Sequence, residues 1–318
     1  MAFAVPGKPD CRILLTGISG QVGHDLQPYL ARLGEVIAPG REKLDLARPE
    51  QIRKVVRELR PHWIINPAAY TAVDRAETEP ELAYAINRDA AAVLAEEAKS
   101  IGAVLVHFST DYVFDGGKAA PYVETDAVNP LNVYGSSKLA GEQAIQQSGA
   151  AHLIFRTSWI YSMRGRNFLR AILKLAGERE ELRIVNDQHG APTWSRDLAM
   201  LTAHVMEKIE IQSATTGASL AETASDLSGL YHACSAGETT WFGFAEEALR
   251  LCKMQMPQTH FAKLTPIPTS DYPTLALRPL NSRLDCGKLA VKFGMRIPAW
   301  DKSLNQLMVE APFESVHT

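Results

Sequence analysis

The chain has 318 residues, a formal net charge of -3, 46% hydrophobic and 22% charged residues. This composition is typical of a globular protein, and the length allows one large domain or two smaller ones. The acidic balance argues against nucleic acid as a partner, because a nucleic-acid surface would be basic. No apolar run approaches the roughly 20 residues that span a bilayer, so no membrane partner is expected.

The first ten residues, MAFAVPGKPD, contain two prolines and lack the apolar core of a signal peptide. They predict a loose leader at 1–10. The four cysteines stand at positions 11, 234, 252 and 286, with no CxxC pair and no metal-ligand spacing. We therefore expect reduced thiols, no bound metal and a cytoplasmic protein.

From residue 12 onward, short apolar runs alternate with helical patterns. Helices are predicted at 49–60 and 80–100, because each segment opens with proline and carries apolar residues at helical spacing. The apolar runs have the character of strands buried on both faces, and they lie at 12–17, 35–39, 63–69, 104–110 and 152–161. This alternation predicts an α/β fold, a Rossmann-type doubly wound parallel sheet with right-handed crossovers.

The pattern loosens after about residue 161. The segment 211–226 is rich in Ser, Ala and Thr without sustained apolar periodicity, and it is expected to be a mobile surface insertion. The proline-rich segment 265–284 cannot form one continuous helix. We expect a dinucleotide-binding domain at 11–165, to which segments of about 225–255 return, and a smaller, irregular carboxyl-terminal substrate lobe at 166–318.

The loop TGISGQVG follows the first predicted strand and precedes a helix. Its residues Gly17, Gly20 and Gly23 permit a tight turn and let backbone N–H groups approach a pyrophosphate. The helix that follows directs its positive end at the same phosphate. This context favours a dinucleotide site over a plain structural turn.

The end of the second strand bears on the choice between NADPH and NADH. An acidic residue there would bind the ribose hydroxyls, but the segment APGREKLDL has Arg41 instead. An arginine suits a 2′-phosphate, which favours NADPH and leaves NADH open; a solvated surface arginine is the alternative. Asp45 and Leu46 then fall where a loop could flank the adenine. After the third strand, Ala69 is small enough for the backbone to lie against the cofactor.

Polar residues at the end of the fourth strand and on the next helix suggest a ketone reductase. Thr110 and Asp111 lie at the ligand-binding edge, and Tyr134 and Lys138 are one turn apart on one helix face. A phenol has a pKa near 10, and a neighbouring ammonium favours its ionised form and lowers that pKa. Tyr134 can therefore deliver a proton, Lys138 can also hold the nicotinamide ribose, and Thr110 can orient the carbonyl. A bare YxxxK is more often an exposed surface pair, but the glycine loop and the STD strand end favour catalysis.

These residues belong to a set of motifs that resembles the extended short-chain dehydrogenase/reductases. Within that family the resemblance is to the dTDP-4-dehydrorhamnose reductases, over about residues 12–307. The glycine loop and YxxxK are common to the superfamily, whereas TAVD.AE, RTSW.Y and NDQ.GAPT are far more specific. The motifs are GISGQVG, NPAAYTAVDRAE, STDYVFDG, PLNVYGSSKLAGE, FRTSWIY, NDQHGAPT and RPLNSRL.

The resemblance implies NAD(P)H-dependent reduction of the C4 ketone of dTDP-4-dehydro-β-L-rhamnose to dTDP-β-L-rhamnose. It makes Tyr134 the proton donor, Lys138 its partner and Thr110 the hydroxyl that tunes its pKa. It places NDQHGAPT (186–193) in the nucleotide pocket, and a homodimer is possible. The resemblance also implies cofactor contacts by Gly20, Gln21, Val22, Ala69, Tyr70 and Thr71. The dTDP-sugar would be bound by Thr110, Asp111, Trp159 and Arg278. Alternatively, Trp159 is a buried core residue and Arg278 is an exposed surface residue.

Two departures from the family pattern stand out. Phe108 precedes STD where the family often has tyrosine, which removes a polar cofactor contact. Some members dimerise through a magnesium ion held by glutamates; here Asp25 and Asp301 could substitute, but Arg196 stands where an acid would be needed. We therefore expect no metal-bridged dimer.

Two other functions fit the same motifs. One is a non-catalytic NADP-binding regulatory subunit that resembles the β subunit of methionine adenosyltransferase, since fold alone does not fix function. The other is a different nucleotide-sugar reductase or epimerase. Consumption of NADPH would separate the first from an enzyme, and tight retention of NAD would mark an epimerase.

Overall fold

The computed structural model describes residues 11–311, so the predicted leader lies outside the described residues. Six strands form one central sheet in the order β10-β5-β4-β3-β1-β2, and every neighbouring pair is parallel. The order reverses between β1 and β3, where a doubly wound sheet binds its ligand. The predicted α/β class and parallel sheet are confirmed. The strands are β1 (Arg12–Leu15), β2 (Glu35–Ile37), β3 (Trp63–Asn66), β4 (Val104–Thr110), β5 (His152–Thr157) and β10 (Gly229–His232).

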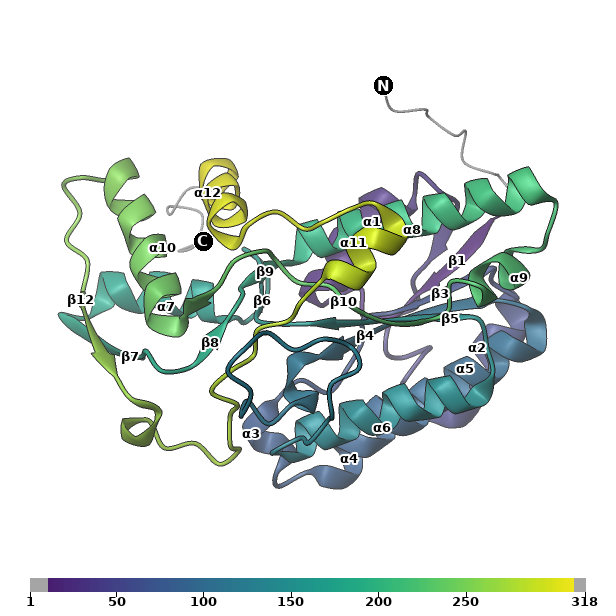
Figure 1. Ribbon diagram of the computed structural model, residues 1–318, viewed down its shortest axis with the longest axis horizontal. Coiled ribbons are helices and arrows are strands. Elements are labelled where there is room, and N and C mark those ends of the chain that lie inside the picture. Colours follow the sequence, from purple (N-terminus) through teal and green to yellow (C-terminus); the bar gives the residue numbers. More distant parts are fainter. Residues whose placement is uncertain (1–10, 312–318) are drawn as a thin grey trace.

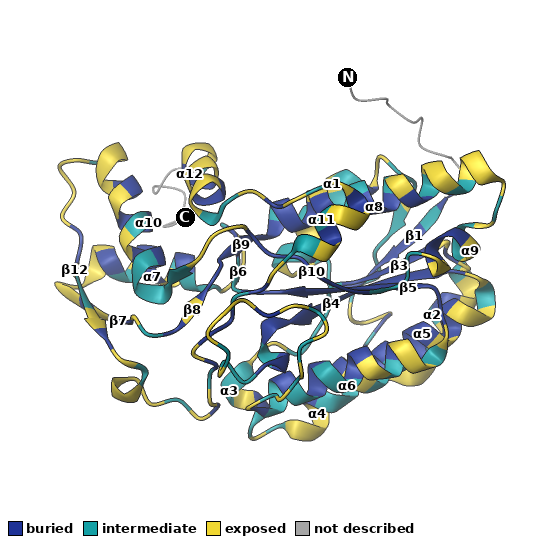
Figure 2. Cartoon of the chain, in the orientation of Figure 1, coloured by how far each residue is buried: buried dark blue, intermediate teal, exposed yellow. Residues whose placement is uncertain are grey.

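Helices cover both faces of this sheet (Figure 1). On one face lie α1 (Gln21–Leu30), α8 (Ser195–Thr216) and α11 (Gly287–Phe293). The other face is covered by α2 (Pro49–Leu59), α5 (Ala90–Ile101) and α6 (Val133–Ser148). The strands of the sheet are buried except for the edge strand β2, while the outward faces of the helices are exposed (Figure 2). Because α8, β10 and α11 belong to these layers, the chain returns to the sheet after residue 166.

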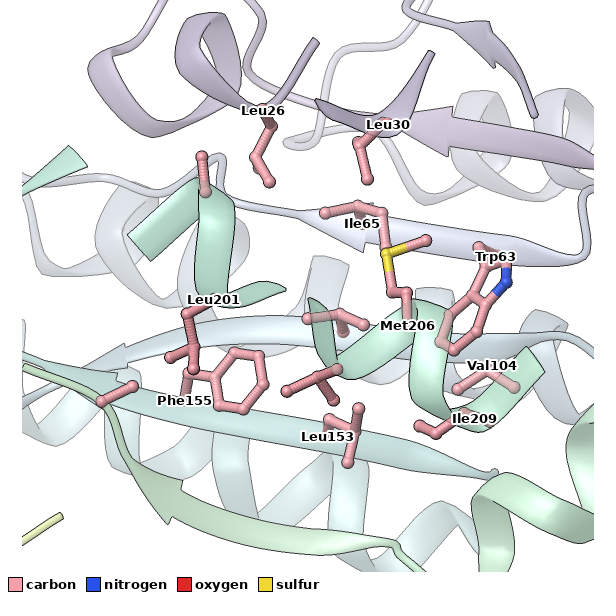
Figure 3. Close-up of a cluster of buried hydrophobic side chains, with 14 of the residues drawn as sticks. Leu26, Leu30, Trp63, Ile65, Val104, Leu153, Phe155, Leu201, Met206 and Ile209 are labelled. Atoms are coloured by element: carbon pink, nitrogen blue, oxygen red, sulfur yellow. The ribbon is translucent and has the colours of Figure 1, made fainter. Parts of the chain in front are cut away.

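The larger core lies between the sheet and α1 with α8. Figure 3 shows Leu26 and Leu30 of α1 facing Ile65 of β3 and Met206 of α8, and these side chains have no exposed surface. Side chains of a strand point alternately to opposite faces, so Val104 and Val106 of β4 join this core while Leu105 joins the core under α2 and α5. Full burial of such a side chain contributes roughly 1.5–3 kcal/mol.

The helix predicted at 80–100 is present but contains one wider turn. It begins as α4 (Pro80–Tyr84), passes through a π-helical turn at Ala85–Asp89 and continues as α5. The turn holds Asn87 buried, with its amide donating to Ser137 Oγ of α6 (2.9 Å) and accepting the Tyr70 N–H (2.9 Å). π-turns of this kind occur frequently near functional sites.

A second lobe, at the left of Figure 1, has its own core. Strands β7 (Glu181–Val185) and β12 (Lys263–Ile267) pair in parallel beneath three helices. The helices are α7 (Phe168–Glu178), α10 (Trp241–Gln255) and α12 (Trp300–Glu310), and the short strands are β6 (Ile160–Tyr161), β8 (His189–Gly190), β9 (Thr193–Trp194) and β11 (Thr239–Thr240). Thus α10, which lies in the segment expected to return to the first domain, packs in the second lobe, whereas β10 lies in the central sheet.

The segment 211–226, expected to be a mobile surface insertion, is helical over most of its length. Helix α8 continues to Thr216, and α9 (Leu220–Ser225) follows after a short turn. A capping box starts α9: the Ser219 hydroxyl accepts the Glu222 N–H while the Glu222 carboxylate accepts the Ser219 N–H. None of the helices within residues 11–311 has the length and apolar character required to cross a membrane.

Candidate active site

A cavity of about 850 Å³ opens at the carboxyl ends of the central strands. It brings the glycine loop together with the polar residues of β4 and α6. Fifteen of the predicted site residues line it: Gly17, Gly20, Gln21, Val22, Gly23, Arg41, Asp45, Leu46, Ala69, Thr71, Thr110, Asp111, Tyr134, Lys138 and Trp159. Tyr70 and Arg278 are not part of its lining.

The glycine loop has the geometry of a phosphate cradle. Gly17 has φ +61°, a conformation that favours glycine, and a Cβ on Gly23 would lie 2.2 Å from the Gly17 carbonyl oxygen. Helix α1 begins at Gln21, and no side chain caps its amino terminus. Backbone N–H groups and the positive end of the helix are therefore left to face a phosphate, so the loop fits a dinucleotide.

Arg41 lies at the other end of the same cavity. Its Nε is 3.7 Å from Asp45 Oδ1, and its side chain is 76% exposed. Asp45 in turn accepts the Ala47 N–H at 3.0 Å, which fixes the loop. An exposed guanidinium in the cavity lining, held among the described residues only by this long contact to Asp45, can meet a phosphate group.

Tyr134 stands at the start of α6, where Asn132 caps the helix by accepting the Gly135 N–H (2.8 Å). Its phenol and the Thr110 hydroxyl form a hydrogen bond. Burial raises the pKa of Tyr134 to about 12, an effect that the hydrogen bond with Thr110 partly offsets. The phenol therefore keeps its proton at neutral pH, as a proton donor must.

The expected lowering of this pKa by Lys138 is absent because the lysine is directed elsewhere. Its Nζ donates to the Phe108 carbonyl oxygen (2.6 Å) and lies 3.1 Å from Nε2 of His107. Burial lowers the pKa of Lys138 to about 8. An ammonium group has three N–H bonds, and these two acceptors are its partners among residues 11–311, so one N–H is left for a ligand.

Behind Lys138 a buried polar chain runs across the sheet. His107 Nδ1 of β4 is 3.0 Å from Nδ2 of Asn66 at the end of β3, and Asn66 Oδ1 accepts the Thr16 hydroxyl (2.7 Å). Burial and the charge of Lys138 hold the pKa of His107 well below its usual value. The imidazole is thus neutral, and its Nε2 accepts from the Lys138 ammonium, so the single ring proton lies on Nδ1.

Asp111 is the most unusual carboxyl group of the cavity. It is buried, and it accepts hydrogen bonds from Ser282 and Thr110. Its Oδ2 has no hydrogen-bond partner among residues 11–311. Burial raises its pKa to about 6. A buried oxygen without a partner is costly, and a ligand hydroxyl would supply the missing bond.

Trp159 forms an aromatic wall between the two lobes. Its ring stacks on Trp241 of α10, with centroids 3.7 Å apart and planes inclined by 10°, and its φ is +48°. Gly190 packs so closely that a Cβ there would come within 2.6 Å of the Trp159 ring. This contact explains the glycine of NDQHGAPT, which supports Trp159 from behind. A left-handed φ at a bulky residue is strained, a feature that concentrates at ligand sites.

Tyr70 and Arg278 are engaged with protein groups. The Tyr70 hydroxyl donates to Glu79 (2.5 Å), and the Arg278 guanidinium donates to both oxygens of Asp74 (2.8 and 3.1 Å). The pair with Asp74 ties the proline-rich segment to α3 (Val73–Ala76). A diphosphate contact by Arg278 stays a prediction that requires this pair to open.

Two of the three residues weighed for a metal site are likewise engaged. Asp25 accepts the hydroxyl of Ser195, and Arg196 makes a two-bond ion pair with Glu310 (2.5 and 2.7 Å). The arginine therefore has a partner within its own chain.

Sequence reasoning missed several residues of this site. Thr157 lines the cavity, and its buried hydroxyl has no partner among the described residues. His107 and Asn66 lie within predicted strands, where a polar residue in an otherwise apolar run was the available signal. Ser282 and Trp241 come from distant segments, and no local pattern connects them to the cavity.

The fold and the cavity define a dinucleotide-binding protein of the Rossmann type, with a phenol, an amine and a hydroxyl at the substrate end. The family model described as the RmlD substrate binding domain matches residues 11–312, and the chain belongs to this family.

Relatives and solved structures match it over nearly its whole length. It is 45% identical to a dTDP-4-dehydrorhamnose reductase of Burkholderia thailandensis, and the alignment covers 91% of this chain and 95% of that protein. The corresponding enzyme of Escherichia coli K12 is 44% identical over 94% of this chain and 97% of its own length. A crystal structure of dTDP-4-dehydrorhamnose reductase from Bacillus anthracis in complex with NADP has a TM-score of 0.83 and 34% identity, and it covers 94% and 99% of the two chains.

Proposed function

We propose that the chain reduces the C4 ketone of dTDP-4-dehydro-β-L-rhamnose to dTDP-β-L-rhamnose, with NADPH as the reductant. The observation that carries this function is the cavity, which joins the glycine loop to Thr110, Tyr134 and Lys138 in one space. The relatives named as dTDP-4-dehydrorhamnose reductases and the Bacillus anthracis structure with NADP supply the substrate and the cofactor.

The proton-transfer groups suit reduction rather than oxidation. When bound, the nicotinamide supplies the hydride. Tyr134 holds its proton at neutral pH and gives it to the carbonyl oxygen as negative charge develops there. Thr110 is bonded to the same phenol, and in the structure its own hydrogen goes to Asp111 (3.0 Å). Thr110 orients the carbonyl oxygen and stabilises the phenolate that remains once this hydrogen turns from Asp111 to the reacting oxygen.

Lys138 and the glycine loop fix the cofactor end. The third N–H of the Lys138 ammonium is available for the nicotinamide ribose, while Phe108 and His107 hold the amine in place. The Gly17–Gly23 loop receives the pyrophosphate at the amino terminus of α1. Ala69 and Thr71, which line the cavity after β3, complete the cofactor side.

On the substrate side, Asp111 accepts a sugar hydroxyl through its unpartnered oxygen, and Trp159 packs against the sugar nucleotide. The two-domain division at about residue 165, a homodimer and a cytoplasmic location remain predictions from the sequence.

The test is product analysis with the purified chain, dTDP-4-dehydrorhamnose and either NADPH or NADH. We expect stoichiometric NADPH consumption and formation of dTDP-rhamnose. A chain that binds NADPH without consuming it would instead be a regulatory subunit. A chain that retains NAD through purification and interconverts two sugars would be an epimerase.

A further inference from the structure

Two cysteines that lie 52 residues apart in the sequence meet in the fold. Cys234 follows β10, and Cys286 directly precedes α11; their Sγ atoms are 3.6 Å apart. Both are free thiols in the structure. Their sulfurs lie in a small apolar cluster with Phe114, Tyr122 and Leu284, which packs the end of β10 against the segment that leads into α11.

The two thiols differ in character. Cys286 is half-buried, and its sulfur accepts the Cys234 backbone N–H (3.4 Å) as well as the Cys234 thiol. These bonds hold the pKa of Cys286 below its usual value, while its neighbour and full burial raise the pKa of Cys234. The partly exposed sulfur of Cys286 is therefore the better nucleophile, and the buried sulfur of Cys234 lies next to it.

A second cavity gives access to this pair. It has a volume of about 290 Å³ and is lined by both cysteines together with Arg283, Arg296 and Glu238. It is separate from the cavity of the proposed active site, because the two share none of their lining residues. A small peroxide fits such a space, and Arg296 offers hydrogen-bond donors to its oxygens, while Arg283 is bonded to Asn281 and Glu238.

We propose that Cys234 and Cys286 form a peroxide-sensitive thiol pair whose disulfide slows the reductase. The Cys286 thiolate attacks one oxygen of a hydroperoxide, the O–O bond breaks, and the alcohol, or water from hydrogen peroxide, leaves after taking up a proton. The resulting sulfenic acid is attacked by the sulfur of Cys234, which loses its proton as the S–S bond forms and water leaves. Two thiols are thereby oxidised and one peroxide is reduced.

The disulfide would reach the active site through two contacts. Cys234 packs in the same apolar cluster as Ala191, whose carbonyl oxygen accepts the hydroxyl of Ser158 at the cavity (2.9 Å). Ser282, four residues before Cys286, interacts with Asp111. A disulfide has a sulfur–sulfur distance of about 2.05 Å, so the two sulfurs must approach by about 1.5 Å from their present 3.6 Å. A displacement of about 1 Å in a catalytic site costs on the order of 10²-fold in rate. We expect a loss of at least tenfold, because only part of this movement is passed to Asp111.

The experiment uses the full chain, first reduced and freed of dithiol, then treated with hydrogen peroxide and alkylated. Trypsin releases Cys286 in the peptide 284–288 and Cys234 in the peptide 209–250. Mass spectrometry is expected to find these two peptides linked, and dithiothreitol is expected to separate them and restore turnover. The disulfide linkage is detected without substrate, so this measurement does not depend on the proposed function. Only the activity measurement rests on that function, and the two failures can therefore be distinguished.

Three variants complete the test. Cys286→Ser is expected to keep its basal activity and to lose the response to peroxide, whereas Cys234→Ser stops at a sulfenic acid that dimedone traps. Cys252→Ala is the matched control, because Cys252 lies in the core of the second lobe, and it should respond as the unaltered chain does. Unlinked peptides, a linked protein with unchanged turnover, or equal inhibition of Cys286→Ser would each overturn the proposal.

Discussion

Replacement of Tyr134 by phenylalanine tests the proton donor directly. The change removes one hydroxyl and retains the ring, which packs edge-on against Tyr112 at a centroid distance of 5.7 Å. The lost hydrogen bond with Thr110 contributes about 1 kcal/mol to stability, too little to unfold a domain. The variant should therefore fold and retain the cavity.

The expected loss is in the chemical step. A positioned general acid contributes about 10²–10⁴-fold to a rate. At about 1.36 kcal/mol for each factor of ten, this corresponds to roughly 2.7–5.4 kcal/mol of lost transition-state stabilisation. Lys138 is not expected to replace the phenol, because Phe108 and His107 hold two of its three N–H bonds and the third is assigned to the nicotinamide ribose.

The assay follows NADPH absorbance under saturating dTDP-4-dehydrorhamnose, with NADPH affinity measured separately by fluorescence titration. We expect kcat to fall by the factor above and the NADPH Kd to stay within about threefold. Tyr112→Phe is the control, since it removes a buried phenol beside Tyr134 that does not line the cavity. Turnover of Tyr134→Phe within tenfold of normal, or an equal loss in Tyr112→Phe, would refute the assignment.

Three further changes probe the cofactor, the substrate pocket and the core. Arg41→Ala should weaken NADPH binding more than NADH binding in a titration. Arg32→Ala, at an exposed arginine outside the cavity, is the control and should affect neither cofactor. Equal losses of affinity for both cofactors in Arg41→Ala would remove the case for a 2′-phosphate contact. Asp111 has a pKa of about 6 in the folded chain and about 3.9 when unfolded, so its protonation favours folding below pH 4 and this contribution is lost as the pH rises through 6. Asp111→Asn should therefore raise the free energy of unfolding at pH 7 by about 1–3 kcal/mol while turnover falls, and a destabilised variant at that pH would contradict this sign. Glu142→Gln breaks a buried ion pair with an arginine of β5, so it should lower the free energy of unfolding, measured in urea, by about 3–5 kcal/mol. The control Glu178→Gln breaks an exposed pair and should lower it by less than about 1 kcal/mol. A similarly small loss in both variants would show that burial does not matter here.

Local signals in the sequence were sufficient for the central sheet and the glycine loop. A buried strand such as 104–110 begins with an apolar run, and a loop that needs a positive φ at Gly17 shows its glycine directly. The segment 152–161 was predicted as one strand, but β5 ends at Thr157 and the chain turns at Trp159, whose left-handed φ no propensity predicts.

Helix α9 was missed although a local signal existed. The residues Ser219 and Glu222 stand three apart and form a capping box, but the weak apolar periodicity of 211–226 outweighed them. The terminal turns of α8 have no buried residue after Ile209, so the helix there is maintained by its backbone and not by a core-facing stripe.

Side-chain partners distant in sequence were beyond local reasoning. Arg278 looked free to meet a diphosphate, yet it pairs with Asp74, 204 residues away. The cysteines at 234 and 286 looked unrelated because only the packing of β10 against α11 brings them together. The direction of the Lys138 amine is a third case, since it depends on the carbonyl group and the imidazole that β4 presents beneath α6.

The geometry of α6 over β4 explains why the YxxxK pair needs a polar layer below it. Residues four apart share one helix face, so Tyr134, Lys138 and Glu142 point toward the sheet at intervals of about one turn. Below them, His107 faces the amine, and Ser109 donates to the Glu142 carboxylate.

The third of these helix residues carries the charge balance of the layer. Glu142 accepts two bonds from Arg156 of β5, at 2.9 and 2.6 Å, and Arg156 stands opposite Ser109 in the register of β4 and β5. Lys138 and Glu142 thus meet polar groups of the sheet, which offsets the cost of removing them from water, although Nη1 of Arg156 is left without a partner among the described residues. Because the amine and the carboxylate have partners within the protein, the helix can hold them buried beside a protonated phenol without a bound ligand. The proposed catalytic pair is therefore preorganised by β4 and β5, and its position does not depend on the substrate to assemble it.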